Sequence, residues 1–200
     1  MNTKLFEGEL VRLTAVDPEK DSEDIARWSL DSHYLRLRKG LPARPATAQQ
    51  IKERVEKQEA REDGFFFELR TRAENRHIGF IHLWWVIWAQ ADAFIAIGIG
   101  EPELRGKGYG TDAMRVLVRY AFHELNLHRV SLRVLAENAR AIRAYEKTGF
   151  VIEGRERGAD SRDGQRTDII WMGLLREDWE KEVFQSSVHG PESAARNTRA

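Results

Sequence analysis

The sequence contains no cysteine, and this absence excludes several kinds of site. Without a thiol the chain forms no disulfide, no cysteine-ligated zinc or iron–sulfur centre and no cysteine nucleophile. The six histidines also lack the paired spacing of a histidine metal site. We therefore expect no bound metal ion.

Long apolar runs are absent as well. The longest uncharged apolar stretch, from Ile78 to Ala89, is interrupted by His82, whereas a bilayer-spanning helix needs about 20 apolar residues. Residues 1–9 already carry acidic side chains and hold no apolar segment of signal-peptide length. We therefore expect no membrane partner and a cytoplasmic location.

Net charge is the third thing that the chain lacks, since 32 acidic residues balance 32 basic residues. This balance excludes a domain-wide basic field for nucleic acid, although it allows a local basic patch. With 42% hydrophobic and 32% charged residues, the composition is that of an ordinary globular protein. We expect one folded domain over residues 1–184 and a disordered tail over residues 185–200.

Hydrophobic periodicity predicts both strands and helices. The predicted strands cover residues 9–14, 65–70, 78–86, 93–99, 129–135, 150–156 and 168–174, and the predicted helices cover residues 23–30, 48–62, 111–125 and 139–147. Thr47 and Asn138 are the expected N-caps of two helices, Leu30 is a candidate core residue, and residues 32–47 are expected to form a loop. Strands in a run, followed by alternating helices and strands, predict one mixed-sheet α/β or α+β domain.

The most informative segment is a glycine-rich turn between a predicted strand and the strongest predicted helix. It reads Arg105-Gly-Lys-Gly-Tyr-Gly-Thr111. Glycines at 106, 108 and 110 let backbone N–H groups converge, and the helix N-terminus adds a partial positive charge. Such a turn cradles a phosphate, with Arg105 and Lys107 as further charges. The spacing fits neither the Walker nor the dinucleotide pattern, and a turn without a ligand is the alternative.

A second segment, residues 138–150, carries the pattern N-x-x-A-x-x-x-Y-x-x-x-G-F. Taken alone, Asn138 is a helix N-cap and Tyr145 is a packing residue. Taken with the first segment, which matches Q/R-x-x-G-x-G/A, it resembles the two signatures of the GNAT family of N-acetyltransferases. The resemblance covers residues 9–184 and is closest to the branch of ribosomal-protein alanine and serine N-terminal acetyltransferases.

This resemblance implies a fold and a co-substrate. The fold is a GNAT-like single α/β (α+β) domain, with a mixed, mostly antiparallel twisted sheet of about seven strands, splayed between the fourth and fifth, and about four helices. The co-substrate is acetyl-CoA, bound through its pyrophosphate by the glycine turn and through its pantetheine arm by the end of the fourth strand. The implied cofactor-binding residues are Gly98, Ile99, Gly100, Arg105, Gly106, Lys107, Gly108, Tyr109, Gly110, Thr111 and Asn138.

The resemblance also implies a reaction. Tyr145 is the expected general acid for the departing CoA thiolate. The acetyl acceptor is a primary amine, either a small molecule or a protein N-terminus. Since no cysteine is available, we expect direct transfer in a ternary complex.

The sequence does not identify a general base. Phe94 and Arg133 occupy the two positions where many relatives carry a glutamate. Asp92, Glu101 and His82 are left as candidates that act through water.

Other features leave alternatives open. The cluster Arg36, Arg38, Lys39 and Arg44 is either a solvated loop or a site for an acidic acceptor or acyl carboxylate, and Trp84, Trp85 and Trp88 are expected to pack on the sheet. One rival hypothesis is a non-catalytic acyl-CoA-binding module. A ribosome-associated RNA-binding protein is a weaker rival, because the net charge is zero. A homodimer also stays open, because the sequence does not decide the oligomeric state.

Overall fold

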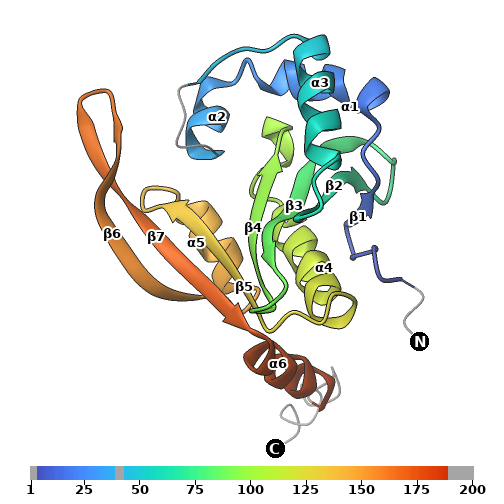
Figure 1. The fold of residues 1–200 in the computed structure, drawn as a ribbon, viewed down its shortest axis with the longest axis vertical. Coiled ribbons are helices and arrows are strands. Elements are labelled where there is room, and N and C mark those ends of the chain that lie inside the picture. The colour runs from blue at the N-terminus through green and yellow to red at the C-terminus, as the bar shows by residue number, and fades with distance from the viewer. Residues whose placement is uncertain (1–3, 39–42, 189–200) are drawn as a thin grey trace, which may run out of the picture.

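A seven-stranded sheet is the centre of the fold (Figure 1). The computed structural model describes residues 4–38 and 43–188 of the chain. The strand order is β1-β2-β3-β4-β5-β7-β6, and every neighbouring pair is antiparallel except β4 with β5. The strands are β1 Val11–Thr14, β2 Gly64–Thr71, β3 His77–Ile87, β4 Asp92–Ile99, β5 Arg129–Leu135, β6 Val151–Arg162 and β7 Gln165–Leu175.

Helices cover both faces of this sheet. Within the described residues they are α1 Pro18–Trp28, α2 Ser32–Arg38, α3 Ala48–Glu59, the 3-10 helix η1 Pro102–Leu104, α4 Tyr109–His123, α5 Ala139–Glu146 and α6 Arg176–Val188. Side chains of a strand alternate between faces. Accordingly, Phe65 and Phe67 of β2 contact Tyr120 of α4, whereas Phe66 points to the side of α1 and α3. The predicted α/β class and the seven strands are confirmed.

The sheet opens between β4 and β5. These two strands pair only where Asp92, Ala93 and Phe94 face residues 129–131. Beyond Phe94 the strands diverge, which confirms the predicted splay. The β6–β7 hairpin extends from the far side of this opening, and its turn at Asp163 and Gly164 reaches α2 through an ion pair between Asp163 and Arg36 (Figure 1).

Two helices differ from the sequence prediction. Residues 32–38 form α2 where a loop is expected, because Asp31 accepts the N–H of Tyr34 (2.9 Å) and the first helix-breaking residue is Gly40. Residues 176–188 form α6, so the predicted domain boundary at residue 184 falls inside a helix. Its Trp179 packs against the rings of Phe122 and His123.

The ends of other helices also shift. Helix α1 begins at Pro18, where Asp17 is the N-cap and its side chain accepts the N–H of Lys20. It ends at Trp28, so Leu30 lies outside it and is 70% exposed, which makes its prediction as a core residue wrong. The predicted caps at Thr47 and Asn138 are both confirmed. Across the described ranges, no helix has the length and apolarity needed to cross a membrane.

Asp112 in the first turn of α4 attaches the beginning of β1 to this helix. Its buried carboxylate accepts the backbone N–H groups of Glu9 (3.0 Å), Leu10 (2.7 Å) and Val11 (2.9 Å). A carboxylate that satisfies several buried donors cannot be removed without leaving those donors unpaired. The position of α4, and of the glycine turn before it, therefore depends on Asp112.

We expect Asp112→Ala to lower the free energy of unfolding by about 3 kcal/mol, because each buried unsatisfied donor typically costs about 1–3 kcal/mol. Urea denaturation followed by circular dichroism measures the change. Glu124→Ala is the matched control, since it removes an exposed carboxylate just after the same helix and is expected to change stability by less than about 0.5 kcal/mol. Equal stability of the two variants would contradict the role of Asp112.

Candidate active site

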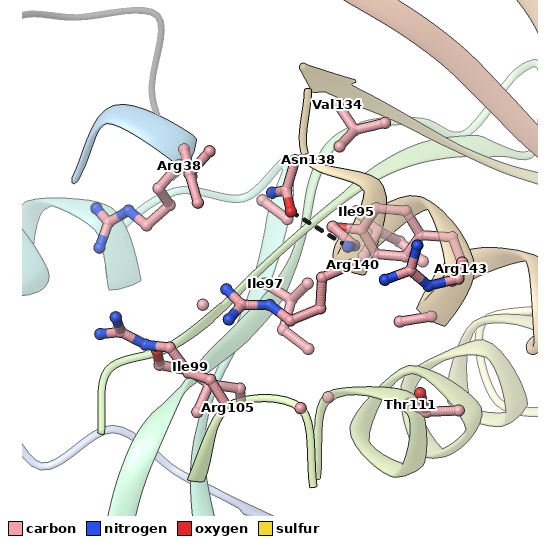
Figure 2. Close-up of a pocket in the computed structure, with 18 of the residues that line it drawn as sticks. Arg38, Ile95, Ile97, Ile99, Arg105, Thr111, Val134, Asn138, Arg140 and Arg143 are labelled. Atoms are coloured by element: carbon pink, nitrogen blue, oxygen red, sulfur yellow. Dashed lines mark hydrogen bonds between the residues drawn. The ribbon is translucent and has the colours of Figure 1, made fainter. Parts of the chain in front are cut away.

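A cavity of about 500 Å³ fills the opening between β4 and β5 (Figure 2). The strand β4, the glycine turn, and helices α2 and α5 line it. Most of the residues that the sequence selected meet here, namely Gly98, Ile99, Arg105, Gly106, Gly108, Gly110, Thr111, Asn138 and Tyr145. Gly100, Lys107 and Tyr109 do not line the cavity, and the ring of Tyr109 packs against the hydrophobic core.

The glycine turn adopts a backbone that favours glycine. Gly106 (φ 79°) and Gly108 (φ 93°) lie in the left-handed region, and Gly108 is the residue that precedes α4. No side chain caps this helix, so the N–H groups of its first turn remain available. These amides and the helix dipole face the cavity together and form an anion site.

The backbone of β4 offers a second set of donors. The N–H of Gly100 donates to the carbonyl of Ile78 on β3 (2.8 Å), and alternation along the strand turns the groups of Ile95, Ile97 and Ile99 the other way. The pairing of Phe94 with Ser131 uses the N–H of Ile95, whereas the N–H groups of Ile97 and Ile99 lie beyond the last paired residue and face the cavity that these residues line. An extended ligand can bond to them as an added strand would.

Arg105 holds the end of β4 in place. Its guanidinium donates to the carbonyl oxygens of Ile99 (2.9 Å) and Gly100 (2.6 Å) and to the carboxylate of Asp31 (2.8 Å). The side chain is only 11% exposed. Arg105 is therefore first a positioning residue for β4, although the sequence suggests it as extra charge for a phosphate.

Close packing explains a glycine in the middle of this segment. A Cβ atom on Gly98 would lie 2.4 Å from the hydroxyl oxygen of Tyr34 and 2.7 Å from the ring of Phe80. The hydroxyl of Tyr34 is buried, and no hydrogen-bond partner for it is found in the described structure. A buried donor without a partner is available to a ligand beside β4. No sequence motif points to Tyr34, because only the position of α2 brings it here.

Helix α5 contributes the second motif. The side chain of Asn138 accepts the N–H of Ala141 (3.2 Å), so this residue is the structural cap and also lines the cavity. Tyr145 lines the same cavity, and its ring lies 6.2 Å from that of Phe150. Burial raises the pKa of Tyr145 to about 12, so its hydroxyl keeps its proton at neutral pH.

Three cations on α5 and just after it were not selected from the sequence. Arg140 and Arg143 (Figure 2) and Lys147 line the cavity, and they have no carboxylate partner among the described residues. Their spacing of three and four residues is the signal that places them on one helical face. They make this wall of the cavity suited to a polyanionic ligand.

The three candidates for a general base lie in different places. Glu101 is buried among Arg27, Trp28 and Arg76. Burial alone would raise the pKa of Glu101, but the hydrogen bonds from Arg27 and Trp28 outweigh it and lower this pKa. Asp92 lies at the opposite end of β4, where burial raises the pKa of Asp92. Neither lines a described cavity.

His82 is the candidate that does. It lies in a second cavity, of about 550 Å³, between α3 and the β2–β3 face of the sheet. Its ring contacts those of Phe66 (5.1 Å) and Phe80 (5.5 Å). This cavity also receives Glu68, a buried acid within the apolar run of β2 that the sequence analysis does not select.

The basic residues Arg36, Arg38 and Arg44 do not lie together in one loop. Arg36 pairs with Asp163 of the β6–β7 turn (2.6 Å), whereas Arg38 lies over the ring of Phe80 (4.6 Å) and lines both cavities. Arg44 is exposed, and Lys39 lies outside the described residues.

The expected packing of three tryptophans is only partly right. Trp84, Trp85 and Trp88 are 39%, 53% and 55% exposed. The ring of Trp85 stacks on those of Trp84 and Phe94, and the ring of Trp84 is tilted against Phe94. Residues 4–38 and 43–188 contain no group of three or more His, Asp or Glu side chains that could hold a metal ion.

Sequence comparisons agree with this arrangement. Residues 11–151 match the family model of the acetyltransferase (GNAT) domain. The probable N-acetyltransferase YjcK of Bacillus subtilis (strain 168) is 36% identical over 133 residues, which are 66% of this chain and 71% of that protein. The SPbeta prophage-derived uncharacterized N-acetyltransferase YokL of the same strain is 31% identical over 181 residues, which are 90% and 98% of the two chains.

A structural comparison gives the same fold. The crystal structure of spermidine N-acetyltransferase from Vibrio cholerae in complex with CoA and spermine has a TM-score of 0.76 over 85% of this chain and 98% of that one, at 24% sequence identity. Since the family match spans well over half of the sequence, the chain belongs to the GNAT family and is an acetyl-CoA-dependent N-acetyltransferase.

Proposed function

We propose that this chain acetylates a primary amine by direct transfer from acetyl-CoA within a ternary complex. One observation carries the proposal. The cavity between β4 and β5 brings the glycine cradle, the unpaired β4 amides and Tyr145 together, and Arg38 joins it to a second cavity on the other side of β4. The first cavity suits the co-substrate and the second suits an acceptor.

The first cavity provides a donor for each part of acetyl-CoA. The amides of residues 106–111 bind the pyrophosphate, and the cations Arg140, Arg143 and Lys147 bind phosphate oxygens. The free amide hydrogens of Asn138 bind the pantetheine arm, since its oxygen is already bonded to Ala141. Acetyl-CoA supplies an activated thioester carbonyl.

The amides of Ile97 and Ile99 polarise that carbonyl. They point into the cavity because β5 no longer pairs with this part of β4. They are held in place because β3 pairs with the same strand on its other side. Fixed N–H donors that stabilise a developing oxyanion lower the barrier of acyl transfer. Arg105 supports these amides indirectly, by fixing the carbonyl groups at the end of β4.

The reaction then requires two proton transfers, one to the departing sulfur and one from the amine nitrogen. The neutral amine nitrogen bonds to the acetyl carbon, and the carbon–sulfur bond breaks. Tyr145 gives its phenolic proton to the departing sulfur and regains one from solvent, while the nitrogen releases its extra proton to water. The products are the N-acetylated amine and CoA with a free thiol, so atoms and charge balance.

The acceptor is proposed only as a class. A small-molecule amine fits the second cavity, whose volume is within the usual range for small ligands. A protein N-terminus is the alternative that the motif resemblance to the ribosomal-protein branch suggests, and a polyamine is the alternative that the spermidine acetyltransferase neighbour suggests. A thiol-release assay over amines and N-terminal peptides tests the function directly.

Gly108→Glu is expected to weaken CoA binding at least about tenfold, because it strains a left-handed backbone position and places a negative charge at the phosphate cradle. Isothermal titration calorimetry measures the dissociation constant. Gly164→Glu is the matched control, since it imposes the same strain and charge at the β6–β7 turn, far from the cradle. Unchanged CoA affinity in folded Gly108→Glu protein would rule out the cradle as the phosphate site.

Tyr145→Phe is expected to lower kcat about 100-fold and to leave CoA affinity unchanged. The substitution keeps the ring and removes the proton donor, which acts on the transition state more than on the bound ground state. Steady-state kinetics with a confirmed amine acceptor measure the effect. Tyr120→Phe is the control, since Tyr120 packs against Phe67 of β2 and does not line the cavity. A kcat within a factor of two of the unsubstituted protein would make Tyr145 a packing residue.

A further inference from the structure

The second cavity has an aromatic floor. It lies between α3 and the sheet, and Phe66, Phe80, His82 and Trp84 project into it from β2 and β3. Its volume of about 550 Å³ admits a small molecule with an apolar body. Acetyl-CoA is assigned to the first cavity, so this second space is left for the acceptor.

Strand register connects this floor to the reacting segment of β4. His82 faces Phe66 on one side and Ala96 of β4 on the other, and Phe80 faces Gly98. Paired residues project to the same face, and neighbouring strands are about 4.8 Å apart. A ligand on this floor is therefore one strand from the β4 amides, and Arg38, which lines both cavities, marks the junction.

Positive charge surrounds the cavity. Arg38, Arg54, Lys57 and Arg61 line it. Arg61 pairs with Asp63, whereas the other three have no carboxylate partner in the described part of the chain. Unpaired cations beside an apolar cavity create a positive potential that attracts an anionic group.

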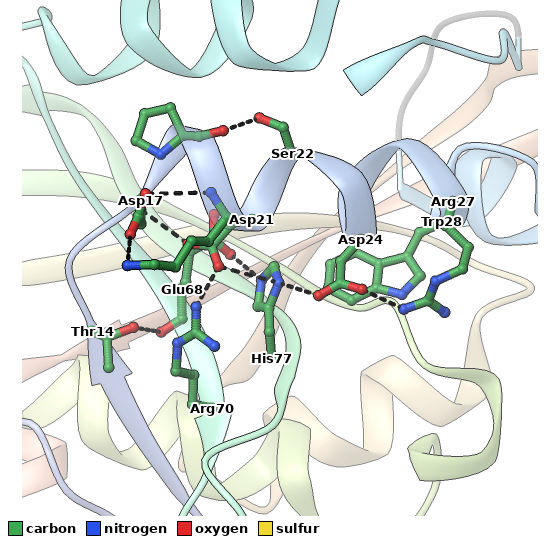
Figure 3. A network of polar contacts seen from close by, with 12 residues as sticks. Thr14, Asp17, Asp21, Ser22, Asp24, Arg27, Trp28, Glu68, Arg70 and His77 are labelled. Carbon is green, nitrogen blue, oxygen red and sulfur yellow. Dashed lines mark hydrogen bonds and ion pairs between the residues drawn. The ribbon is translucent and has the colours of Figure 1, made fainter. Parts of the chain in front are cut away.

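Of the described lining residues, only Glu68 is acidic, and it is already engaged. It is 3% exposed and its carboxylate contacts His77 Nε2 (2.8 Å), while His77 Nδ1 contacts Asp24 (3.1 Å) (Figure 3). Burial raises the pKa of Glu68, and the contact with His77 already occupies its carboxylate. It therefore does not balance the cations of the cavity.

We propose that this cavity binds the acceptor, and that the acceptor is a small amine which also carries a carboxylate. The amine faces β4, the apolar body lies on the aromatic floor, and the carboxylate pairs with Arg38, Arg54 and Lys57. The inference rests on the proposed acetyl transfer and names the substrate class for it. A polyamine, with several positive charges, meets repulsion here and finds no free carboxylate among the described lining residues.

Matched acceptors test the proposal. Phenylalanine and leucine are compared with phenylalaninamide and leucinamide, in which a neutral amide replaces the carboxylate, and spermidine is the polycationic probe. The amides have the less basic amines, so amine basicity alone favours them. We expect kcat/KM to be at least about tenfold higher for each amino acid than for its amide, and spermidine to be the poorest acceptor.

Variants of the lining cations test where the acceptor carboxylate binds. Arg54→Gln and Lys57→Gln are expected to raise the KM of the carboxylate acceptor about tenfold each and to leave the KM of acetyl-CoA unchanged, because neither residue lines the first cavity. Lys52→Gln on the same helix is the control. Lys52 does not line the second cavity and pairs with Glu19, so its variant tests for a general effect of lost charge.

The outcomes distinguish a failure of the proposed substrate class from a failure of the proposed amine acetylation. Amides or spermidine used as well as the carboxylates, or a KM that responds equally to Lys52→Gln, would overturn the proposed substrate class and leave amine acetylation standing. If no amine in the panel is acetylated although CoA binds, the proposed function fails instead. Calorimetric titration of phenylalanine against phenylalaninamide into the CoA-loaded protein then decides the carboxylate preference by itself.

Discussion

The loss of pairing between β4 and β5 beyond Phe94 and Ser131 is the constraint on which the site depends. Parallel neighbours in a sheet normally satisfy each other's backbone groups, and unpaired groups in the interior are costly. Here the amides of Ile97 and Ile99 stay unpaired and face a cavity. The sheet thus contains a gap that a ligand with its own amide groups completes.

Several separate contacts keep that gap open. On one side, Arg105 binds the last carbonyl groups of β4 and ties them to Asp31, and Tyr34 packs on Gly98 too closely for any larger residue. On the other side, α5 carries Tyr145 and its neighbouring cations. The gap is therefore a rigid feature of the fold, which suits a site where donors must be in place before the reaction begins.

The parts that depend on local chemistry could be predicted from the sequence. The glycine cradle, the Asn138 cap and the succession of strands along the chain rest on residues close together in the sequence, and each is where the pattern predicts. Contacts between distant segments could not be predicted. The ion pair of Arg105 with Asp31 and the hydroxyl of Tyr34 beside Gly98 exist only because the segment of Asp31 and α2 folds over the end of β4.

The second cavity illustrates the same limit. Glu68 belongs to an apolar strand and Arg54 to a charged helix, and neither pattern indicates that they share a cavity. Charge balance over the whole chain also concealed the local excess of cations, because the 32 acidic residues lie largely elsewhere or in ion pairs. A net charge of zero is a statement about the sum and carries no information about a single site.

Hydrogen exchange of the β4 amides, measured residue by residue by NMR with and without acetyl-CoA, tests the central claim most directly. In the free protein the amides of Ile97 and Ile99 should exchange rapidly, whereas those of Ala96 and Gly98, bonded to β3, should be protected. Saturating acetyl-CoA should then protect Ile97 and Ile99 at least about tenfold. Exchange at these two amides that is slow in the free protein, or unchanged on binding, would contradict the account.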